Sequence, residues 1–357
     1  MLLIIVGAGA TFDSDWRRQI VKSRFVDRDA TSPTTGSRPP LAKSLFGERF
    51  GRYVARFPPS QGLMVRLRKA GDSVEEELER IRGESASQEH LPRQLMAVRY
   101  YIRELVAEVV ENWVGEAPDR ITNFTQLVGG LEPWRQHSRE SVAIVTFNYD
   151  TLFDEALTNL LPRFRIEQVE NCVADERYQL FKLHGSVNWW REVRAEWIDP
   201  LRAGRTSGTG WATTMCDPPG EFTEDGIFHV SDGMYPPCVP CIAIPMATKS
   251  DSDFVCPPDH IAKLKEALNE ATDVLIIGWK GNERHFLELW RLVWATKKDP
   301  HIGTIGIVDV SVAAGQEIVA KVTHHVGLAP RRDRYYETFS TFVNEKLNEY
   351  LDILPGK

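Results

Sequence analysis

Two polar side chains stand directly after short apolar runs of the chain. Asn148 follows the run 142–147, and His184 follows the run 180–183. Parallel α/β sheets bind ligands at the carboxyl ends of their strands, so we expect both side chains at one edge of a sheet. A carboxamide can orient a water or a sugar hydroxyl, and an imidazole can take a proton from either near neutral pH. We therefore predict that Asn148 and His184 act together in catalysis.

Each of the two residues also has a simpler interpretation. A lone histidine after a strand is commonly a hydrogen-bonded structural residue, and an asparagine there is commonly part of a turn. The predicted placement of Asn148 beside His184 favours function over both alternatives, because a site is recognised by groups that converge.

A glycine-rich turn, Gly7-Ala8-Gly9, ends the apolar run 2–6 at the start of the chain. Such a turn lets the backbone approach a pyrophosphate, and we predict that these three residues cradle one. The third glycine of the usual dinucleotide fingerprint is missing, since residues 13–15 read Asp-Ser-Asp. A tight turn that merely requires glycine stays open as the alternative.

Strands and helices alternate along most of the chain, which predicts an α/β fold with a Rossmann-like, doubly wound parallel sheet. The expected strands are 2–6, 142–147, 180–183, 241–245, 273–278 and 302–310. The expected helices of the sheet are 150–161, 259–271, 283–296, 313–325 and 335–354. Asp150 or Thr151 is available to cap the first of these helices.

One domain is expected over 1–357, with two segments that depart from the alternation. Apolar residues at helical spacing over 91–113 indicate a long helix, and 60–135 is predicted to be a helical insertion after the first strand. Residues 191–240 are rich in Gly, Pro and Trp and predict an irregular excursion. The stretch 13–59 reads as a long loop that leads into a short helix.

Composition excludes several classes of protein. The net charge of −7 argues against direct nucleic-acid binding, which requires a basic face. No apolar run approaches the roughly 18–20 residues that span a bilayer, and the first residues read as a core strand, not a signal peptide. The odd number of cysteines, 5 in a large chain, argues against a disulfide framework, so we expect a cytoplasmic protein.

Four short motifs occur in an order that resembles the sirtuin-like (silent-information-regulator-like) NADase domains of bacterial anti-phage defence proteins. They are Gly7-Ala8-Gly9, Phe147-Asn148-Tyr149-Asp150, Leu183-His184-Gly185-Ser186 and Ile277-Gly278-Trp279. The loop 38–41 and the segment 278–283 also look like positions in that group. The motifs are short, but their order spans most of the chain.

The resemblance implies a function and a role for each matching residue. Members bind NAD in a Rossmann-like sheet, and an Asn and a His act on the bond between nicotinamide and ribose. Asn148 would orient the attacking water and the ribose hydroxyls, and His184 would be the general base. Asp150 matches the family's Asp and would contact the cofactor, although capping a helix is the commoner role of such a residue. Gly278 and Asp309 would lie near the adenosine end.

The chain departs from protein-deacylating sirtuins at two points. Phe147 stands where those enzymes carry Gln, and their paired CxxC motifs of a zinc module are not present. The four cysteines that could ligate zinc have irregular spacing, so we expect no metal; they are Cys216, Cys238, Cys241 and Cys256. The resemblance therefore implies an NAD+ glycohydrolase, with NAD as its substrate. A module that binds NAD or ADP-ribose without turnover and an NAD-dependent protein deacylase stay open as alternatives.

The resemblance also implies partners. Members often form oligomers and are held inactive until a signal arrives, so we expect a homo-oligomer. The sequence contains no obvious sensor module, P-loop or nuclease motif. An activating partner is therefore expected on another chain, with a HerA-type ring ATPase preferred over a short Argonaute. No membrane partner is expected.

Overall fold

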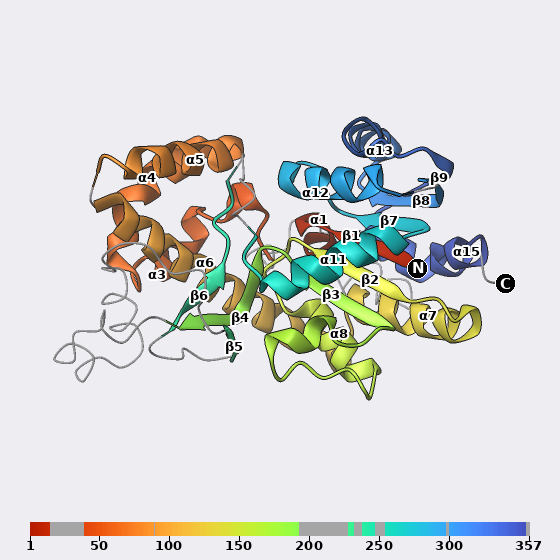
Figure 1. Cartoon of the computed structure of the whole chain (residues 1–357). Coiled ribbons are helices and arrows are strands. Elements are labelled where there is room, and N and C mark those ends of the chain that lie inside the picture. The colour runs from red at the N-terminus through yellow and green to blue at the C-terminus, as the bar shows by residue number, and fades with distance from the viewer. Residues whose placement is uncertain are drawn as a thin grey trace.

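The computed structural model describes residues 1–14, 39–88, 90–192, 228–231, 238–246, 254–297 and 300–354. These residues form a large parallel sheet covered by helices, a group of helices beside it, and a small antiparallel sheet between the two (Figure 1). Most of the excursion predicted for 191–240 lies outside the described residues, and so do Cys216 and residues 15–38 of the loop predicted for 13–59, which include Arg38. The described part of that loop, 39–59, contains several short helical turns.

The large sheet has the strand order β3-β2-β1-β7-β8-β9, and all neighbouring strands are parallel. Its strands are β1 (Leu2–Val6), β2 (Val142–Thr146), β3 (Tyr178–Lys182), β7 (Asp273–Ile277), β8 (Ile302–Asp309) and β9 (Pro330–Glu337). From β1 the chain adds strands outward on one side, as β2 and β3, and from β7 it adds them outward on the other side, as β8 and β9. The strand order therefore reverses between β1 and β7, as in a Rossmann-type sheet. The predicted fold class is therefore confirmed.

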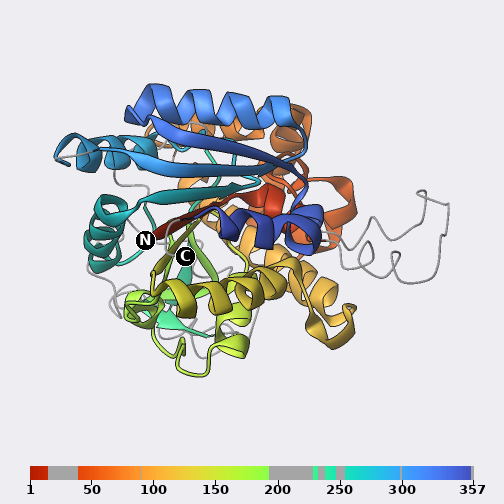
Figure 2. The same cartoon turned by 90° about the vertical axis from the view of Figure 1, so that its right-hand side faces the viewer.

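Apolar runs form the central strands because helices cover both faces of the sheet. Every residue of β1, β2 and β7 is buried. On one side lie α12 (Arg284–Ala295) and α13 (Val312–Val326), next to α11 (Pro258–Glu270). On the other side lie α7 (Asn123–Ser138) and α8 (Leu152–Leu160); Figure 2 shows the sheet between its two helical layers.

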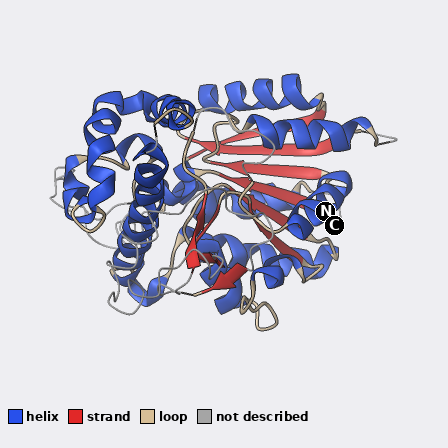
Figure 3. Cartoon of the chain, turned by 60° about the vertical axis from the view of Figure 1, so that its left-hand side comes forward, coloured by secondary structure: helices blue, strands red, loops and turns tan. Residues whose placement is uncertain are grey.

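The described part of the chain between β1 and β2 contains helices joined by short turns and no strand. Its longer helices are α4 (Gln61–Ala70), α5 (Val74–Ser85) and α6 (His90–Gly115), which follow the short α3 (Gly51–Val54). These helices form a body beside the sheet (Figure 3), whereas α7 packs on α8. The apolar stripe predicted over 91–113 is the buried face of α6.

The small sheet consists of β5 (Phe228–Val230), β4 (Gly185–Glu192) and β6 (Cys238–Ile242) in that order, with antiparallel pairing. The strand expected at 241–245 is found at Cys238–Ile242, three residues earlier, and it belongs to this small antiparallel sheet and not to the large parallel one. Helix α6 packs against β4 and β6, so the helical insertion covers this sheet.

The prediction of one helix over 335–354 is wrong. Residues up to Glu337 form β9, and helical structure begins only afterwards, with α14 (Phe339–Thr341), a π-helical turn (Phe342–Lys346) and α15 (Leu347–Asp352). β9 is an edge strand that is mostly exposed, and its sequence Pro-Arg-Arg-Asp-Arg-Tyr-Tyr-Glu has no apolar run. The buried-strand pattern that revealed the inner strands is absent from such an edge. None of the described helices is long and apolar enough to cross a membrane.

A buried histidine connects α11 with the segment before β3 and with β4. The ring of His260 packs edge-on to Trp189, and its Nε2 lies 3.1 Å from the Val169 carbonyl oxygen. Its Nδ1 is buried and has no partner among the described residues. Burial lowers the pKa of His260 to about 4, from an ordinary value of 6.5. The neutral ring, with Nε2–H donating to Val169, is therefore the form that the fold accepts.

We predict that His260→Phe weakens the acid sensitivity of the fold. Between about pH 6.5 and pH 4 the unfolded chain binds a proton at His260 that the folded chain does not, so wild-type stability falls as pH falls through this window. The loss due to this residue is at most about 3 kcal/mol. Urea unfolding at several pH values measures it, with His137→Phe on the exposed face of α7 as control. Equal pH profiles of His260→Phe and wild type would contradict the assignment.

Candidate functional site

The turns that follow β1 and β7 touch at the point where the strand order reverses. The Gly9 N–H donates to the Gly278 carbonyl at 3.1 Å, and the Gly7 N–H donates to the Ile277 carbonyl at 3.0 Å. A Cβ on Gly9 would lie 2.9 Å from the Gly278 oxygen, and a Cβ on Gly278 would lie 2.3 Å from the Ala10 nitrogen. Sheets of this type bind ligands at this reversal point.

The glycines of the first turn are therefore needed for the close packing of two backbone turns, whether or not they also contact a ligand. They lead into α1 (Ala8–Asp13), where the Ala10 N–H donates to the Gly7 carbonyl at 3.0 Å. Protein carbonyls thus take the amides of Gly7, Gly9 and Ala10, while Ala8 is exposed. The close backbone contacts explain why this turn requires glycine, which is the simpler of the two interpretations. Binding of a pyrophosphate by the turn stays a prediction.

We predict that Gly278→Ala destabilises the fold more than an equivalent change at an open position. Gly278 has φ +58°, and Gly327 has φ +79° with nothing within 4 Å of its added Cβ. Both substitutions carry the cost of a left-handed backbone, about 1–2 kcal/mol. Gly278→Ala also forces apart two backbone turns, which adds about 1–3 kcal/mol. Denaturant unfolding of both variants measures the difference, and equal losses would show that the turns separate freely.

Asn148 lies two residues beyond β2, and its carboxamide is held from the side of β1. Its Nδ2 donates to the Gly7 carbonyl at 3.1 Å and to the Thr11 Oγ1 at 2.9 Å. The carbonyl of Gly7 can only accept, so the nitrogen of the amide must face it. Asn148 Oδ1 is buried and has no hydrogen-bond partner among the described residues. Asn148 therefore offers an acceptor, and not a donor, to a ligand.

Thr11 connects Asn148 to Asp150. Its hydroxyl accepts from Asn148 Nδ2 and donates to Asp150 Oδ2 at 2.7 Å. Asp150 Oδ1 accepts from the Leu152 N–H at 3.1 Å, at the beginning of α8. Both carboxylate oxygens thus have protein partners. Burial raises the pKa of the Asp150 carboxyl, while Thr11, Lys182 and the Leu152 N–H act in the opposite direction.

The turn after Asn148 rests on a buried ion pair. Lys182 ends β3 and is fully buried. Its Nζ donates to the Asp150 carbonyl at 2.7 Å and to Asp154 Oδ2 at 2.6 Å. A buried pair of this kind adds little net stability, but removing one partner leaves the other charge uncompensated, so it fixes the local geometry. Asp150 thus accepts hydrogen bonds from the first residue of α8 and from Thr11. Its contact with a ligand stays a prediction.

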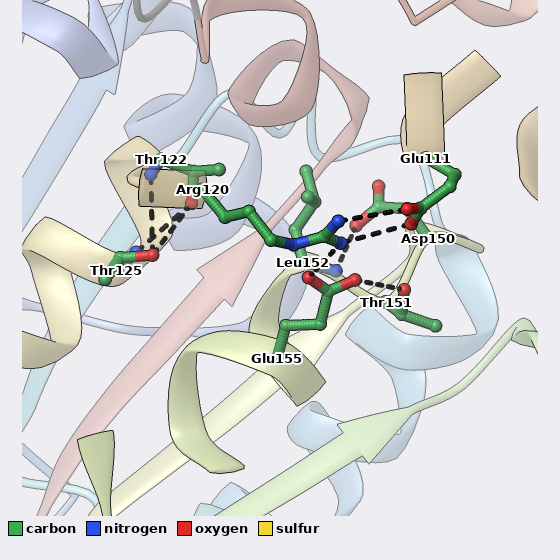
Figure 4. A network of polar contacts seen from close by, with 8 residues as sticks. All are labelled: Glu111, Arg120, Thr122, Thr125, Asp150, Thr151, Leu152 and Glu155. Atoms are coloured by element: carbon green, nitrogen blue, oxygen red, sulfur yellow. Dashed lines mark hydrogen bonds and ion pairs between the residues drawn. The ribbon is translucent and has the colours of Figure 1, made fainter. Parts of the chain in front are cut away.

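The same turn is tied to the helical insertion on its exposed side. Figure 4 shows Arg120 between Glu111 of α6 and Glu155 of α8, beside Asp150, Thr151 and Leu152. Arg120 donates to Glu111 at 3.0 and 3.1 Å and to Glu155 at 3.1 Å. Exposed ion pairs contribute modestly, about 0–1 kcal/mol each, so this contact orients the elements more than it stabilises them.

His184 lies two residues beyond β3 in a largely aromatic environment. Its ring centroid is 5.1 Å from that of Phe147 and 6.4 Å from that of Tyr149. His285, near the beginning of α12, stacks on it at 5.9 Å. Gly185 follows with φ +74°, and a Cβ there would lie 1.9 Å from the Cys241 carbonyl oxygen. The His-Gly pair thus lets the chain pass from the large sheet directly against β6.

The structure places Asn148 and His184 at corresponding positions. Thr146 pairs with Lys182 in the register of β2 and β3, so each candidate lies two residues past the last paired residue. Their side chains have different neighbours, since Asn148 is held by Gly7 and Thr11 and His184 packs against Phe147 and His285. A substrate that uses both must extend from the β1 turn toward α12.

Phe147, the residue before Asn148, is a packing residue. It stacks on Trp279 with centroids 5.6 Å apart and meets Phe286 edge-on at 5.4 Å. Trp279 Nε1 donates to Glu283. This position therefore supplies an apolar wall beside His184 in place of a hydrogen-bonding amide.

The remaining predicted residues have less direct support. Asp309 ends β8 and accepts from the Val310 N–H at its own Oδ1, and its contact with adenosine stays a prediction. Two surface hollows lie beside 174–177, which leads into β3. They are thus at the amino edge of the sheet, opposite the site, and a parallel sheet does not bind its ligand there.

The cysteines form no metal centre within the described residues. Cys238 and Cys241 are three residues apart on β6, an odd spacing that directs side chains to opposite faces of a strand. Burial raises the pKa of Cys241 to about 11 and that of Cys256 to about 12, so both are thiols at neutral pH. Cys216, the fourth cysteine considered, is not described.

Sequence reasoning missed Thr11, Lys182 and His285. Thr11 lies two residues after the glycine turn, where a hydroxyl at the beginning of the first helix faces the next strand end. Lys182 gave a signal in the sequence, because it is a charged residue between the apolar residues Leu180-Phe181 and Leu183. Nothing in the local sequence connects His285 to His184, because the chain from β4 to α11 separates them.

The segment that carries both candidates matches a known domain family. Residues 142–198 match the family model of the SIR2-like domain, and they include β2, Asn148, β3 and His184. This central part of the chain is therefore similar to the SIR2-like domain. No curated protein sequence matches the chain.

Solved Sir2 structures align with most of the chain, but their identity and TM-scores are low. A Sir2 homologue mutant in complex with ADP-ribose has a TM-score of 0.36 and 12% identity, and covers 91% of each chain. A structure described as a basis for the mechanism and regulation of Sir2 enzymes has a TM-score of 0.38 and 11% identity, with 100% of this chain and 93% of that chain covered. A Sir2 mutant with a p53 peptide and NAD has a TM-score of 0.36 and 12% identity, with 98% and 93% covered. The fold assignment depends on the strand order of this chain's own sheet.

Proposed function

We propose that the chain is an NAD+ hydrolase that cleaves the bond between nicotinamide and ribose and releases nicotinamide and ADP-ribose. The observation that carries the proposal is the buried Asn148 Oδ1, which has no partner among the described residues and lies at the edge where the strand order reverses. A buried acceptor without a donor is costly unless a ligand or water supplies one. The SIR2-like match over 142–198 supports NAD as that ligand.

The hydrogen bonds of Asn148 restrict its part in the reaction. Nicotinamide is a good leaving group because it departs as a neutral ring, and cleavage builds oxocarbenium character on the ribose. Asn148 Oδ1 would accept a hydrogen bond from the attacking water or from a ribose hydroxyl. This orients the water oxygen toward the sugar, and such positioning lowers the entropic part of the barrier.

His184 would act as the general base. A neutral imidazole takes the proton from the water or the ribose hydroxyl as the new carbon–oxygen bond forms. Phe147, Tyr149 and His285 surround the ring, which fixes its plane. The glycine turn, with the exposed Ala8 at its tip, would contact the pyrophosphate, and Gly278 and Asp309 would lie toward the adenosine.

We predict that Asn148→Ala and His184→Ala each lower the rate of nicotinamide release by about 100-fold or more, while the fold is kept. Asn269→Ala on α11 and His325→Ala on α13 remove the same chemical groups from exposed positions and should retain wild-type rates. Free nicotinamide is followed by chromatography after incubation with NAD, for the chain alone and with a co-expressed candidate partner. Circular dichroism reports the fold of each variant.

The same assay separates the proposal from its alternatives. A module that only binds NAD or ADP-ribose would show binding without nicotinamide release under either condition. A protein deacylase would release nicotinamide only with an acylated peptide and would transfer the acyl group to ADP-ribose. Wild-type turnover in His184→Ala would remove the proposed base, whichever product forms.

We predict that Thr11→Val lowers kcat by about 10- to 100-fold with a smaller change in KM. The substitution keeps the size of the side chain but removes the acceptor for Asn148 Nδ2 and the donor to Asp150 Oδ2. Asn148 would then lose its orientation, while the surfaces that bind substrate stay. Thr11→Ser restores the hydroxyl and should restore kcat. An unchanged kcat in Thr11→Val would show that Gly7 alone orients the amide.

The wider role of the chain is also a proposal. Depletion of NAD by such an enzyme fits an anti-phage effector of the cytoplasm. A homo-oligomer would be the working form, with a HerA-type ring ATPase, or alternatively a short Argonaute, as the chain that senses infection. The basis for these proposals is the order of the motifs between Gly7 and Trp279.

A further inference from the structure

Two buried histidine rings stack on each other at the carboxyl edge of the large sheet. One belongs to His184, the proposed base, and the other to His285, the second residue of α12. Their ring centroids are 5.9 Å apart, and their planes differ by 20°. Each of the two residues is only 4% exposed. Aromatic rings at this separation are in contact, so His285 belongs to the immediate surroundings of the base.

The backbone at His184 is held on two sides. The Ala243 N–H donates to the His184 carbonyl at 2.9 Å, and the Val255 N–H donates to the Leu183 carbonyl at 2.9 Å. These bonds fix where the side chain leaves the backbone. They do not fix the torsion that turns the imidazole about its bond to Cβ, which has broad minima in histidine. The plane of the ring therefore depends on what the ring contacts.

His285 differs from the two other aromatic residues that lie near the His184 ring. Phe147 and Tyr149 come from the turn after β2, and their planes are tilted by 56° and 34° from that of His184. His285 comes from α12, and its plane is closer to parallel, at 20°. A near-parallel neighbour opposes rotation of the ring, because turning the ring would bring its edge toward the neighbouring face. His285 therefore contributes an orientation that the β2 turn does not supply.

The ring of His285 is itself held in place. Phe254, from the segment before α11, has its ring centroid 4.5 Å from that of His285. The next residue of α12, Phe286, meets Phe147 edge-on at 5.4 Å. Two consecutive residues in the first turn of α12 thus contact the side chains that follow β3 and β2. This turn can therefore transmit a fixed position to both strand ends.

The proposed reaction gives His184 a positive charge. When its ring takes a proton from the water or the ribose hydroxyl, an imidazolium forms 5.9 Å from the centre of the His285 ring. The face of an uncharged aromatic ring attracts a cation within about 6 Å, whereas a second cation at this separation repels it. A flat, uncharged ring at position 285 therefore suits both the orientation of the base and the charge that the base gains.

We propose that His285 is a positioning residue for the base of the proposed NAD hydrolase. Its ring sets the plane of the His184 ring and presents an uncharged face to the charge that His184 gains. The effect of His285 on the rate rests on the proposed function. Its effect on the orientation of the His184 ring does not, and it can be measured without turnover.

Two substitutions separate a positioning role from core packing. His285→Phe keeps a flat aromatic ring, and His285→Leu fills a similar volume without one. His285→Phe should retain kcat within about threefold, and His285→Leu should lower it about tenfold or more, with KM changed less than kcat. His325→Leu, an exposed change on α13, should match wild type. Nicotinamide release gives the rates, and circular dichroism gives the folded fraction of each variant.

A second measurement follows the ring of His184 directly. In protein with isotope-labelled histidine, the NMR signal of the His184 Cε1–H is identified by its loss in His184→Gln. The ring current of a stacked neighbour shifts this signal. His285→Leu should therefore move and broaden it, because the ring then samples more than one plane. His285→Phe should leave it narrow, because a flat neighbour is still present.

Two results would overturn the proposal. One is an equal kcat in folded His285→Phe and His285→Leu, since that would show that position 285 only fills the core. The other is an unchanged His184 signal in His285→Leu, since other contacts would then set the plane of the ring. If wild type releases no nicotinamide with or without a partner, the proposed function fails, and the NMR result alone decides whether His285 orients His184.

Discussion

The close approach of three strand ends is the constraint on which the site depends. The turns after β1 and β7 meet through Gly9 and Gly278, where a side chain on either would overlap backbone. The carbonyl of Gly7 then lies where Asn148, from the end of β2, donates to it at 3.1 Å. The Asn148 side chain therefore fixes the position of the β2 turn relative to the β1 turn. The glycines allow the β1 turn to lie close enough for this contact. The glycines position a catalytic candidate even before they contact any ligand.

Most polar atoms around Asn148 have protein partners. Thr11 and the Leu152 N–H take both oxygens of Asp150, and Asp154 Oδ2 pairs with Lys182. Two buried oxygens of this network, Asn148 Oδ1 and Asp154 Oδ1, have no hydrogen-bond partner among the described residues. The groups that have partners make the geometry rigid, since each would lose a buried hydrogen bond if it moved. Asn148 Oδ1, which lies at the end of β2, is thus held in a fixed orientation by the bonds of its own amide nitrogen.

Much of the sheet could be predicted from the sequence, because its inner strands are continuous apolar runs that end in polar or glycine residues. The positions of Asn148 and His184 followed from the same rule. The rule failed at β9, whose exposed edge carries Arg332 and Arg334 where an inner strand would carry apolar residues. It also could not assign the glycines, because their role depends on Gly278, which is distant in sequence from Gly7 and Gly9.

The contacts between elements were beyond sequence reasoning for the same reason. His285 reaches His184 only because α12 follows β7, and β7 lies beside β1 in the sheet. Arg99 has the same periodic position on α6 as Arg103, so spacing predicts the same environment for both. The difference arises from β4, whose Val187 carbonyl accepts from Arg103, whereas Arg99 Nε has no partner among the described residues.

The hydrogen bonds of Asn148 restrict which group of a ligand can bind to it. Its donors are committed to Gly7 and Thr11, so the side chain has only an acceptor left. A ligand that satisfies this oxygen must bring a donor, such as a hydroxyl group or a bound water. The strand ends that hold Asn148 would thus select for hydroxyl groups at this edge of the sheet.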